Sequence, residues 1–324
     1  MNSFILSIRN KVINKDSYGI GIGGVSYLKV PDTITVPIPS EQVGLKVWLQ
    51  EIVKQANPSD ANAGEEVDIV FFVHGYNTDC QEALKRQRLV EVELRKRNFN
   101  CMVIGFDWPT AGNALMYEYD RTQALDAARF LVKGGILPFA NYSVINCPIN
   151  VHVMAHSMGA FVVREAFRLV DKVRDASLAN DWRVGQLVLL GADVSSNCFT
   201  PDNPDTQSIF NHCGRLTNYF SRYDEALAVS NVKNIDISSR AGRIGMPSPT
   251  NSKAVDVDCS SLYAAIPNRK FTIIEGMISH SWYFEDTVWY DDLATTLKGD
   301  IDRNVIPNRT HIGDDKFVLK AGIT

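Results

Sequence analysis

One strand-turn-helix segment restricts the fold more than any other part of the chain. An apolar run over residues 149–154 predicts a strand, and a helical pattern follows over residues 158–173. Only a short turn around Ser157 separates them, with Ala155 two positions before the serine and Gly159 two positions after it. Small residues at these two positions allow a sharp turn, because neighbouring backbone can then come close.

The whole chain alternates strand-like and helix-like segments. This predicts an α/β fold with a mostly parallel central sheet of about eight strands and helices on both faces. Strands are predicted at residues 4–8, 21–30, 67–73, 101–106, 149–154, 184–190, 215–220 and 270–274. Helices are predicted at residues 43–53, capped by Ser40, and at 80–97, 119–132, 158–173 and 283–297.

Two polar stretches and the end of the chain do not follow this alternation of strands and helices. Residues 194–212 and 225–268 are rich in Ser, Asn, Asp and Pro, which predicts loops. We expect residues 1–300 to form one α/β-hydrolase domain and residues 301–324 to form a loosely attached tail.

A serine on such a turn is a candidate nucleophile, but its hydroxyl is weak until a base accepts its proton. The base is expected to be a histidine late in the chain, after the last strand. His280 fits, because it follows the predicted strand at 270–274 and precedes a helix. A loop or capping histidine is the alternative interpretation of His280. The remaining histidines fit less well by position: His74, His152, His156, His212 and His311.

The acid that orients the base is expected between Ser157 and His280, at the end of a strand. Asp224 follows the strand predicted at 215–220, and Asp193 follows the one at 184–190. The usual position, after the seventh strand, favours Asp224, and Asp193 is the alternative.

A hydrolase of this kind also needs two backbone N–H donors for an oxyanion. One is expected from Met158, directly after the serine, and the other from Tyr76, in the turn after the strand at 67–73. His74, Asn77 and His156, which lie in the two turns, are predicted to take part in substrate binding. Trp108 follows the strand at 101–106 and is interpreted either as a wall of the substrate site or as a packing residue.

Composition excludes several other functions. The formal charge of −4 over 324 residues is too small to indicate a nucleic-acid partner. No histidine, cysteine or carboxylate cluster has metal-ligand spacing, so neither a metal nor a cofactor is expected. The N-terminal apolar stretch is too short for a signal peptide, and no run is long enough to span a membrane, so the cytoplasm is the expected location.

Several short segments over residues 65–297 resemble the α/β-hydrolase superfamily and, more narrowly, a bacterial group of uncharacterised α/β hydrolases of unknown function. The resemblance implies a serine hydrolase, most often one acting on carboxylic esters, and its Asp-x-Ala-Leu segment favours Asp224 as the acid. The matching segments are Phe72-Val73-His74-Gly75-Tyr76-Asn77, Phe106-Asp107-Trp108-Pro109, Tyr117-Glu118-Tyr119-Asp120, Ala155-His156-Ser157-Met158-Gly159, Asp224-Glu225-Ala226-Leu227 and Arg243-Ile244-Gly245.

The sequence therefore predicts a serine esterase that acts on a small-molecule ester through Ser157, His280 and Asp224. An amidase or a thioesterase would use the same residues. A catalytically inactive interaction protein on the same fold is the alternative from another class. The sequence does not predict the acyl group, the alcohol or the oligomeric state.

Overall fold

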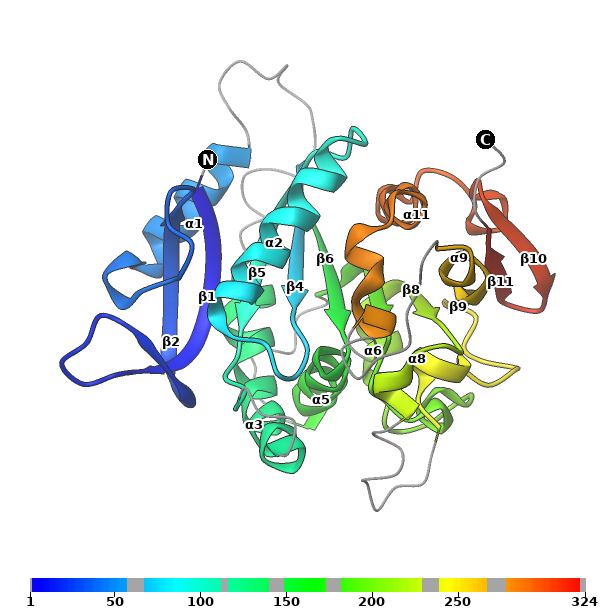
Figure 1. Cartoon of the computed structure of the whole chain (residues 1–324), viewed down its shortest axis with the longest axis horizontal. Helices are drawn as coiled ribbons and strands as arrows, with labels where there is room; N and C mark the ends of the chain where they lie inside the picture. Colours follow the sequence, from blue (N-terminus) through cyan, green and yellow to red (C-terminus); the bar gives the residue numbers. More distant parts are fainter. Residues whose placement is uncertain are drawn as a thin grey trace.

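The computed structural model describes residues 2–56, 67–111, 116–139, 149–172, 182–228, 239–266 and 278–320. Its strands are β1 (Asn2–Lys11), β2 (Tyr18–Pro31), β3 (Gln42–Val43), β4 (Val67–Val73), β5 (Cys101–Asp107), β6 (Ile149–His156), β7 (Val184–Leu190), β8 (Cys213–Phe220), β9 (Ala254–Asp258), β10 (Arg309–Gly313) and β11 (Lys316–Leu319). They form a single 11-stranded sheet in the order β10-β11-β9-β8-β7-β6-β4-β5-β1-β2-β3. The first strands of the chain lie at one edge of the sheet and the last strands at the other (Figure 1).

The centre of the sheet is parallel, as the sequence predicts. Strands β1, β5, β4, β6, β7, β8, β9 and β11 run in one direction, and β2, β3 and β10 pair antiparallel at the two edges. Every residue of β5 is buried, which is typical of a parallel strand covered on both faces. The sheet has more strands than predicted, because β3, β9, β10 and β11 were not expected. The strand predicted at residues 270–274 lies outside the described residues.

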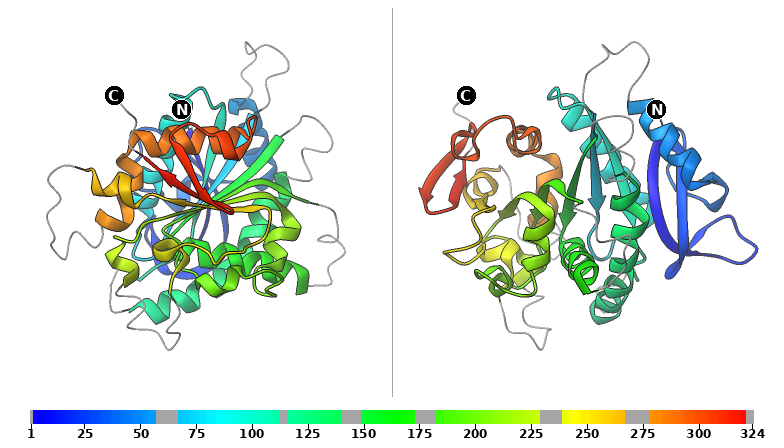
Figure 2. Two further views of the ribbon diagram at one scale, coloured as in Figure 1. Left: turned by 90° about the vertical axis from the view of Figure 1, so that its right-hand side faces the viewer. Right: turned by 180° about the vertical axis from the view of Figure 1, so that it is seen from behind.

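Helices cover both faces of this sheet. They include α1 (Leu45–Ala56), α2 (Cys80–Arg95), α3 (Tyr117–Phe130), α5 (Met158–Lys172), α6 (Gln207–His212), α8 (Ala241–Ile244), α9 (Ser260–Ala264) and α11 (Thr287–Lys298). Because side chains alternate along a strand, Phe71 packs with α1, α3 and α5, whereas Phe72 packs with α2 and α11. The left view of Figure 2 shows α11 above the sheet and α5 below it.

The first helix begins later than predicted, and Ser40 does not cap it. Pro39–Glu41 forms a short 3-10 turn, and the Ser40 hydroxyl donates to Asp16. The next two residues pair with β2 as β3, so the backbone is extended there and the helix starts only at Leu45.

The two polar stretches predicted as loops contain regular structure. Residues 194–212 include α6 and a 3-10 turn at Ser196–Phe199, and residues 225–268 include α8, β9 and α9. Strand β9 reads Ala-Val-Asp-Val-Asp, and its two aspartates interrupt the apolar pattern that predicts a buried strand. Asp256 is buried, but it accepts hydrogen bonds from Asn218 Nδ2 (2.8 Å) and Met246 N (2.6 Å), so a polar residue is satisfied inside the sheet.

The prediction of a loosely attached tail after residue 300 is wrong up to Leu319. Strand β11 pairs in parallel with β9, and Phe317 and Leu319 are buried. The Arg309 side chain is fully buried and lies 2.6 Å from Asp292 Oδ1 of α11. The sequence pattern does not predict this ion pair, because its two residues lie on separate elements.

We expect replacement of Arg309 by methionine to destabilise the protein by about 3–5 kcal/mol, because Asp292 would remain as a buried charge without its cation. Chemical denaturation followed by circular dichroism measures this loss. Arg303→Met is the control, since its pair with Asp315 is partly exposed and its loss is expected to change the stability by less than about 1 kcal/mol. Equal unfolding midpoints for the two variants would contradict the prediction.

Candidate active site

Ser157 occupies the sharp turn between β6 and α5, as the sequence predicts. Its φ angle is 56°, a left-handed conformation that is unusual for a residue other than glycine. The surrounding backbone fixes it there, because Ser157 N donates to Leu190 O (2.9 Å) and Ser157 O accepts from Asp193 N (3.1 Å). The serine is only 5 % exposed.

Close approach of neighbouring backbone explains the small residues around the serine. A Cβ added to Gly159 would lie 2.4 Å from Val73 O and 2.6 Å from His74 O. A Cβ added to Gly75 would lie 2.7 Å from Ser157 Cβ. The turn after β4 therefore sits directly against the serine, as the pairing of Val73 with Ala155 requires.

His280 and Asp224 form a buried pair. His280 Nδ1 lies 2.6 Å from Asp224 Oδ2, and only an Nδ1–H that donates to the carboxylate satisfies this contact. The other oxygen of Asp224 accepts from Leu227 N (3.0 Å). Asp224 is 0 % exposed and His280 is 9 % exposed. In the neutral ring this arrangement puts the one hydrogen on Nδ1 and leaves Nε2 able to accept a proton.

The His280 ring lies beside the residues that flank Ser157. Its centroid is 4.6 Å from that of His156, and a Cβ on Gly191 would lie 3.2 Å from both its Nδ1 and its Cε1. Among the hydrogen bonds of the described residues, none joins Ser157 Oγ to His280. Such bonds are often long before a ligand binds.

Asp193, the alternative acid, has different partners. Its Oδ2 accepts from the Tyr117 hydroxyl at 2.7 Å, and its Oδ1 lies 3.1 Å from Arg240 Nε. Arg240 is itself 1 % exposed. The geometry therefore brings Asp224, and not Asp193, to the histidine.

The two predicted oxyanion donors lie at the start of α5 and in the turn after β4. Met158 is the first residue of α5, where the amides have no partner within the helix and the helix dipole favours negative charge. Tyr76 lies in the β4 turn, by which we mean residues 74–78, and it is half-buried. Asn77 follows it with a φ angle of 54°, and this second left-handed residue turns the chain sharply.

The predicted substrate contacts divide into two groups. Asn77 is half-buried and lies at the surface of the β4 turn, where a contact remains a prediction. Trp108, His74 and His156 are at most 2 % exposed, so the structure does not support the prediction that they line the substrate site.

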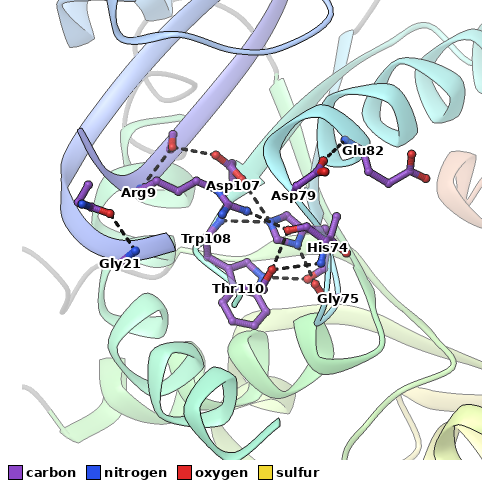
Figure 3. A network of polar contacts seen from close by, with 12 residues as sticks. Arg9, Gly21, His74, Gly75, Asp79, Glu82, Asp107, Trp108 and Thr110 are labelled. Atoms are coloured by element: carbon purple, nitrogen blue, oxygen red, sulfur yellow. Dashed lines mark hydrogen bonds and ion pairs between the residues drawn. The ribbon is translucent and has the colours of Figure 1, made fainter. Parts of the chain in front are cut away.

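The contacts of these buried residues explain their position. Trp108 stacks on His74 with ring centroids 5.5 Å apart, which favours the packing interpretation of the tryptophan (Figure 3). His156 Nε2 donates to His280 O at 2.9 Å. Burial, and the neighbouring His280, lower the pKa of His156 well below its usual value, so this ring is neutral and supports the loop that carries His280.

Sequence reasoning missed three charged residues around the site: Arg9, Asp107 and Arg240. Asp107 stands in a segment noted for its resemblance, but nothing in the sequence indicates its partner. Arg9 lies on β1 and Arg240 precedes α8, and each reaches an aspartate far away in sequence. Arg9 directly follows the mostly apolar run at residues 4–8, and a charged residue next to such a run is the signal that could have identified this pair.

The part of the chain that the structure describes contains neither a cluster of metal-ligating side chains nor a membrane-spanning helix. No group of three or more His, Cys, Asp or Glu side chains there could hold a metal ion. No helix among those residues is long and apolar enough to cross a membrane.

Known proteins resemble the chain over most of its length. Residues 52–284 match the family described as "Alpha/beta hydrolase of unknown function (DUF900)". An uncharacterised protein of Nostoc sp. is 24 % identical over an alignment of 286 positions that covers 71 % of this chain and 73 % of that protein.

Solved structures share less sequence. One, from a study of two fungal esterases of Rhizomucor miehei, is 13 % identical, with a TM-score of 0.29 over 66 % of each chain, so this chain spans just under two thirds of that esterase. The peroxisomal α/β-hydrolase Lpx1 of Saccharomyces cerevisiae is 10 % identical, with a TM-score of 0.33 over 76 % of this chain and 81 % of that one.

The parallel sheet and the serine turn at the end of β6 define an α/β hydrolase. More narrowly, the chain belongs to the family of α/β hydrolases of unknown function whose match spans residues 52–284.

Proposed function

We propose that the protein is a serine hydrolase that cleaves carboxylic esters, with Ser157 as nucleophile, His280 as general base and acid, and Asp224 as the orienting carboxylate. The pair of His280 Nδ1 and the buried Asp224 Oδ2, 2.6 Å apart and next to a serine in a left-handed turn, is the observation that carries the proposal. Chain order also supports it, because nucleophile, acid and base follow one another as they do in α/β hydrolases.

The first half of the reaction acylates the serine. The Ser157 hydroxyl rotates toward His280 Nε2 and transfers its proton while Oγ bonds to the ester carbonyl carbon. Asp224 keeps the Nδ1–H in place and stabilises the imidazolium that forms. The negative oxygen of the tetrahedral intermediate accepts hydrogen bonds from Met158 N–H and Tyr76 N–H. As the intermediate collapses, the bond to the alcohol oxygen breaks, and His280 Nε2–H protonates the leaving alkoxide.

Water completes the reaction by the same route. His280 Nε2 accepts a proton from water as its oxygen bonds to the acyl carbon. A second tetrahedral intermediate forms at the same two N–H groups. It collapses with release of the carboxylic acid, and the proton returns to Ser157 Oγ. The products are one alcohol and one acid, and the enzyme is unchanged.

A fluorophosphonate probe tests the nucleophile directly. We expect the probe to label the protein at Ser157, identified by mass spectrometry of the peptide, and we expect Ser157→Ala to remain unlabelled. A series of p-nitrophenyl esters of rising acyl length, with matched amide and thioester substrates, measures the preferred bond in parallel. Labelling that persists in Ser157→Ala, or a folded wild-type protein that is neither labelled nor active on any of these substrates, would reject the proposal. If the amide or the thioester were turned over faster than the ester, the protein would be assigned as an amidase or a thioesterase that uses the same serine mechanism.

A further inference from the structure

A buried charged network that the proposed mechanism does not use lies against the β4 turn (Figure 3). Asp107, the last residue of β5, is 2 % exposed. Arg9 Nε donates to its Oδ1 at 2.7 Å, and the Ser7 hydroxyl donates to its Oδ2 at 2.9 Å. Burial alone would raise the pKa of Asp107, but the Arg9 guanidinium outweighs it and holds that pKa below its ordinary value. The carboxylate is therefore charged, and both of its oxygens are bonded.

Arg9 also holds the far end of the β4 turn. Its Nη2 donates to Thr78 O at 3.0 Å. The Thr110 hydroxyl donates to the same oxygen at 2.7 Å and accepts from Thr78 N at 3.1 Å. Thr78 is therefore fixed by one side chain from β1 and one from the segment that follows Asp107.

The first residue of the β4 turn, His74, is hydrogen-bonded to the segment that follows Asp107. Trp108 Nε1 donates to His74 O at 2.8 Å, and Trp108 N donates to His74 Nε2 at 3.2 Å. Burial lowers the pKa of His74, so the ring is neutral, with its hydrogen on Nδ1 donated to Gly75 O at 2.8 Å. Tyr76, the proposed oxyanion donor, lies between these two anchored ends.

The local backbone aims Arg9 at this position. Ser7 and Asp107 are the last paired residues of β1 and β5, and the register of β1 against β2 shifts between Ser7 and Arg9. Such irregularities re-aim side chains next to functional sites. A buried ion pair adds little net stability compared with apolar side chains of the same volume, so its main contribution is a fixed, directional geometry.

We infer that Arg9 and Asp107 are positioning residues, which hold the β4 turn so that Tyr76 N–H points at the developing oxyanion. This inference rests on the proposed function. Because an oxyanion exists only in the transition state and the intermediates, loss of the pair should lower kcat and leave KM nearly unchanged. A displacement of a donor by about 1 Å is enough for a loss of about 100-fold.

The test compares two variants of the pair with a matched control. Asp107→Asn removes the charge and keeps the shape, and Arg9→Met/Asp107→Leu removes both charges, so that no buried charge is left alone. Asp292→Asn is the control, because Asp292 is also buried and paired with an arginine but lies on α11, away from the β4 turn. Fluorophosphonate titration counts the active sites, so that kcat refers to folded enzyme only.

We expect both variants of the pair to lose about 100-fold in kcat, with KM within about threefold. Their affinity for a trifluoromethyl ketone, which forms a tetrahedral adduct, should fall in proportion to kcat/KM. The control should lose stability and keep its kcat. A double variant with wild-type kcat would overturn the inference, as would an equal loss of kcat in Asp292→Asn. Failure of the proposed function itself would be recognised separately, since Ser157→Ala would then hydrolyse the substrate as fast as the wild type.

Discussion

Replacement of Asp224 by asparagine is expected to lower kcat for ester hydrolysis by about 10⁴-fold, with little change in the overall structure. An amide at this position can donate to His280 Nδ1, which then loses its own hydrogen and turns the ring into the wrong tautomer. Nε2 would carry the hydrogen and could no longer accept the serine proton. The carboxylate that stabilises the imidazolium would be lost at the same time.

Asp193→Asn is the matched comparison, because both aspartates are buried and both follow neighbouring strands. Its partners are Arg240 and Tyr117, so its replacement should destabilise the fold by about 3–5 kcal/mol, because the buried Arg240 would lose the carboxylate beside it. Its kcat per active site should fall far less than that of Asp224→Asn. Steady-state kinetics with active-site titration and thermal unfolding separate the two effects. A larger loss of kcat in Asp193→Asn would transfer the role of acid to that residue.

Sequence periodicity predicts the centre of this fold well, because strands β4, β5 and β7 are largely buried and consist mostly of apolar residues. It fails where tertiary contacts replace that pattern. Strand β9 contains aspartates that are tolerated because Asn218 and Met246 hydrogen-bond to Asp256. Strands β10 and β11 follow a segment without apolar periodicity, and the buried Arg309–Asp292 pair attaches them. A single sequence carries no sign of contacts between residues so far apart.

In the candidate site, too, local sequence patterns predict some residues, and contacts between distant residues decide the position of others. Ser157 is predicted by local chemistry, since small residues, an apolar strand and a helix surround it within a few positions. Asp224 required an argument about chain order, because its contact with His280 joins residues 56 positions apart. Trp108 and His74 stand at the ends of strands and were expected near the substrate. Their burial depends on how tightly the two turns pack together, which no residue pattern expresses.

Gly159→Ala is expected to destabilise the protein by about 2 kcal/mol or more and to lower kcat by about 100-fold in the molecules that fold. Helix propensity alone predicts the opposite sign, because alanine is more favourable than glycine inside a helix by about 1 kcal/mol. The new Cβ would stand 2.4 Å from Val73 O, and a backbone oxygen in the middle of the sheet cannot rotate away. Either α5, which begins with Met158, or the end of β4, which leads into the turn that contains Tyr76, must move.

Gly44→Ala separates this packing effect from the intrinsic effect of adding a methyl group. Gly44 directly precedes α1, and a Cβ built on it meets no atom within 4 Å. We expect that variant to unfold at the wild-type denaturant concentration, within about 0.5 kcal/mol, and to keep its kcat. If Gly159→Ala were as stable and as active as Gly44→Ala, the approach of β4 to the serine turn would not be as close as the structure has it. The same result would also weaken the case for Tyr76 as an oxyanion donor, because that role requires the β4 turn to lie close to the serine.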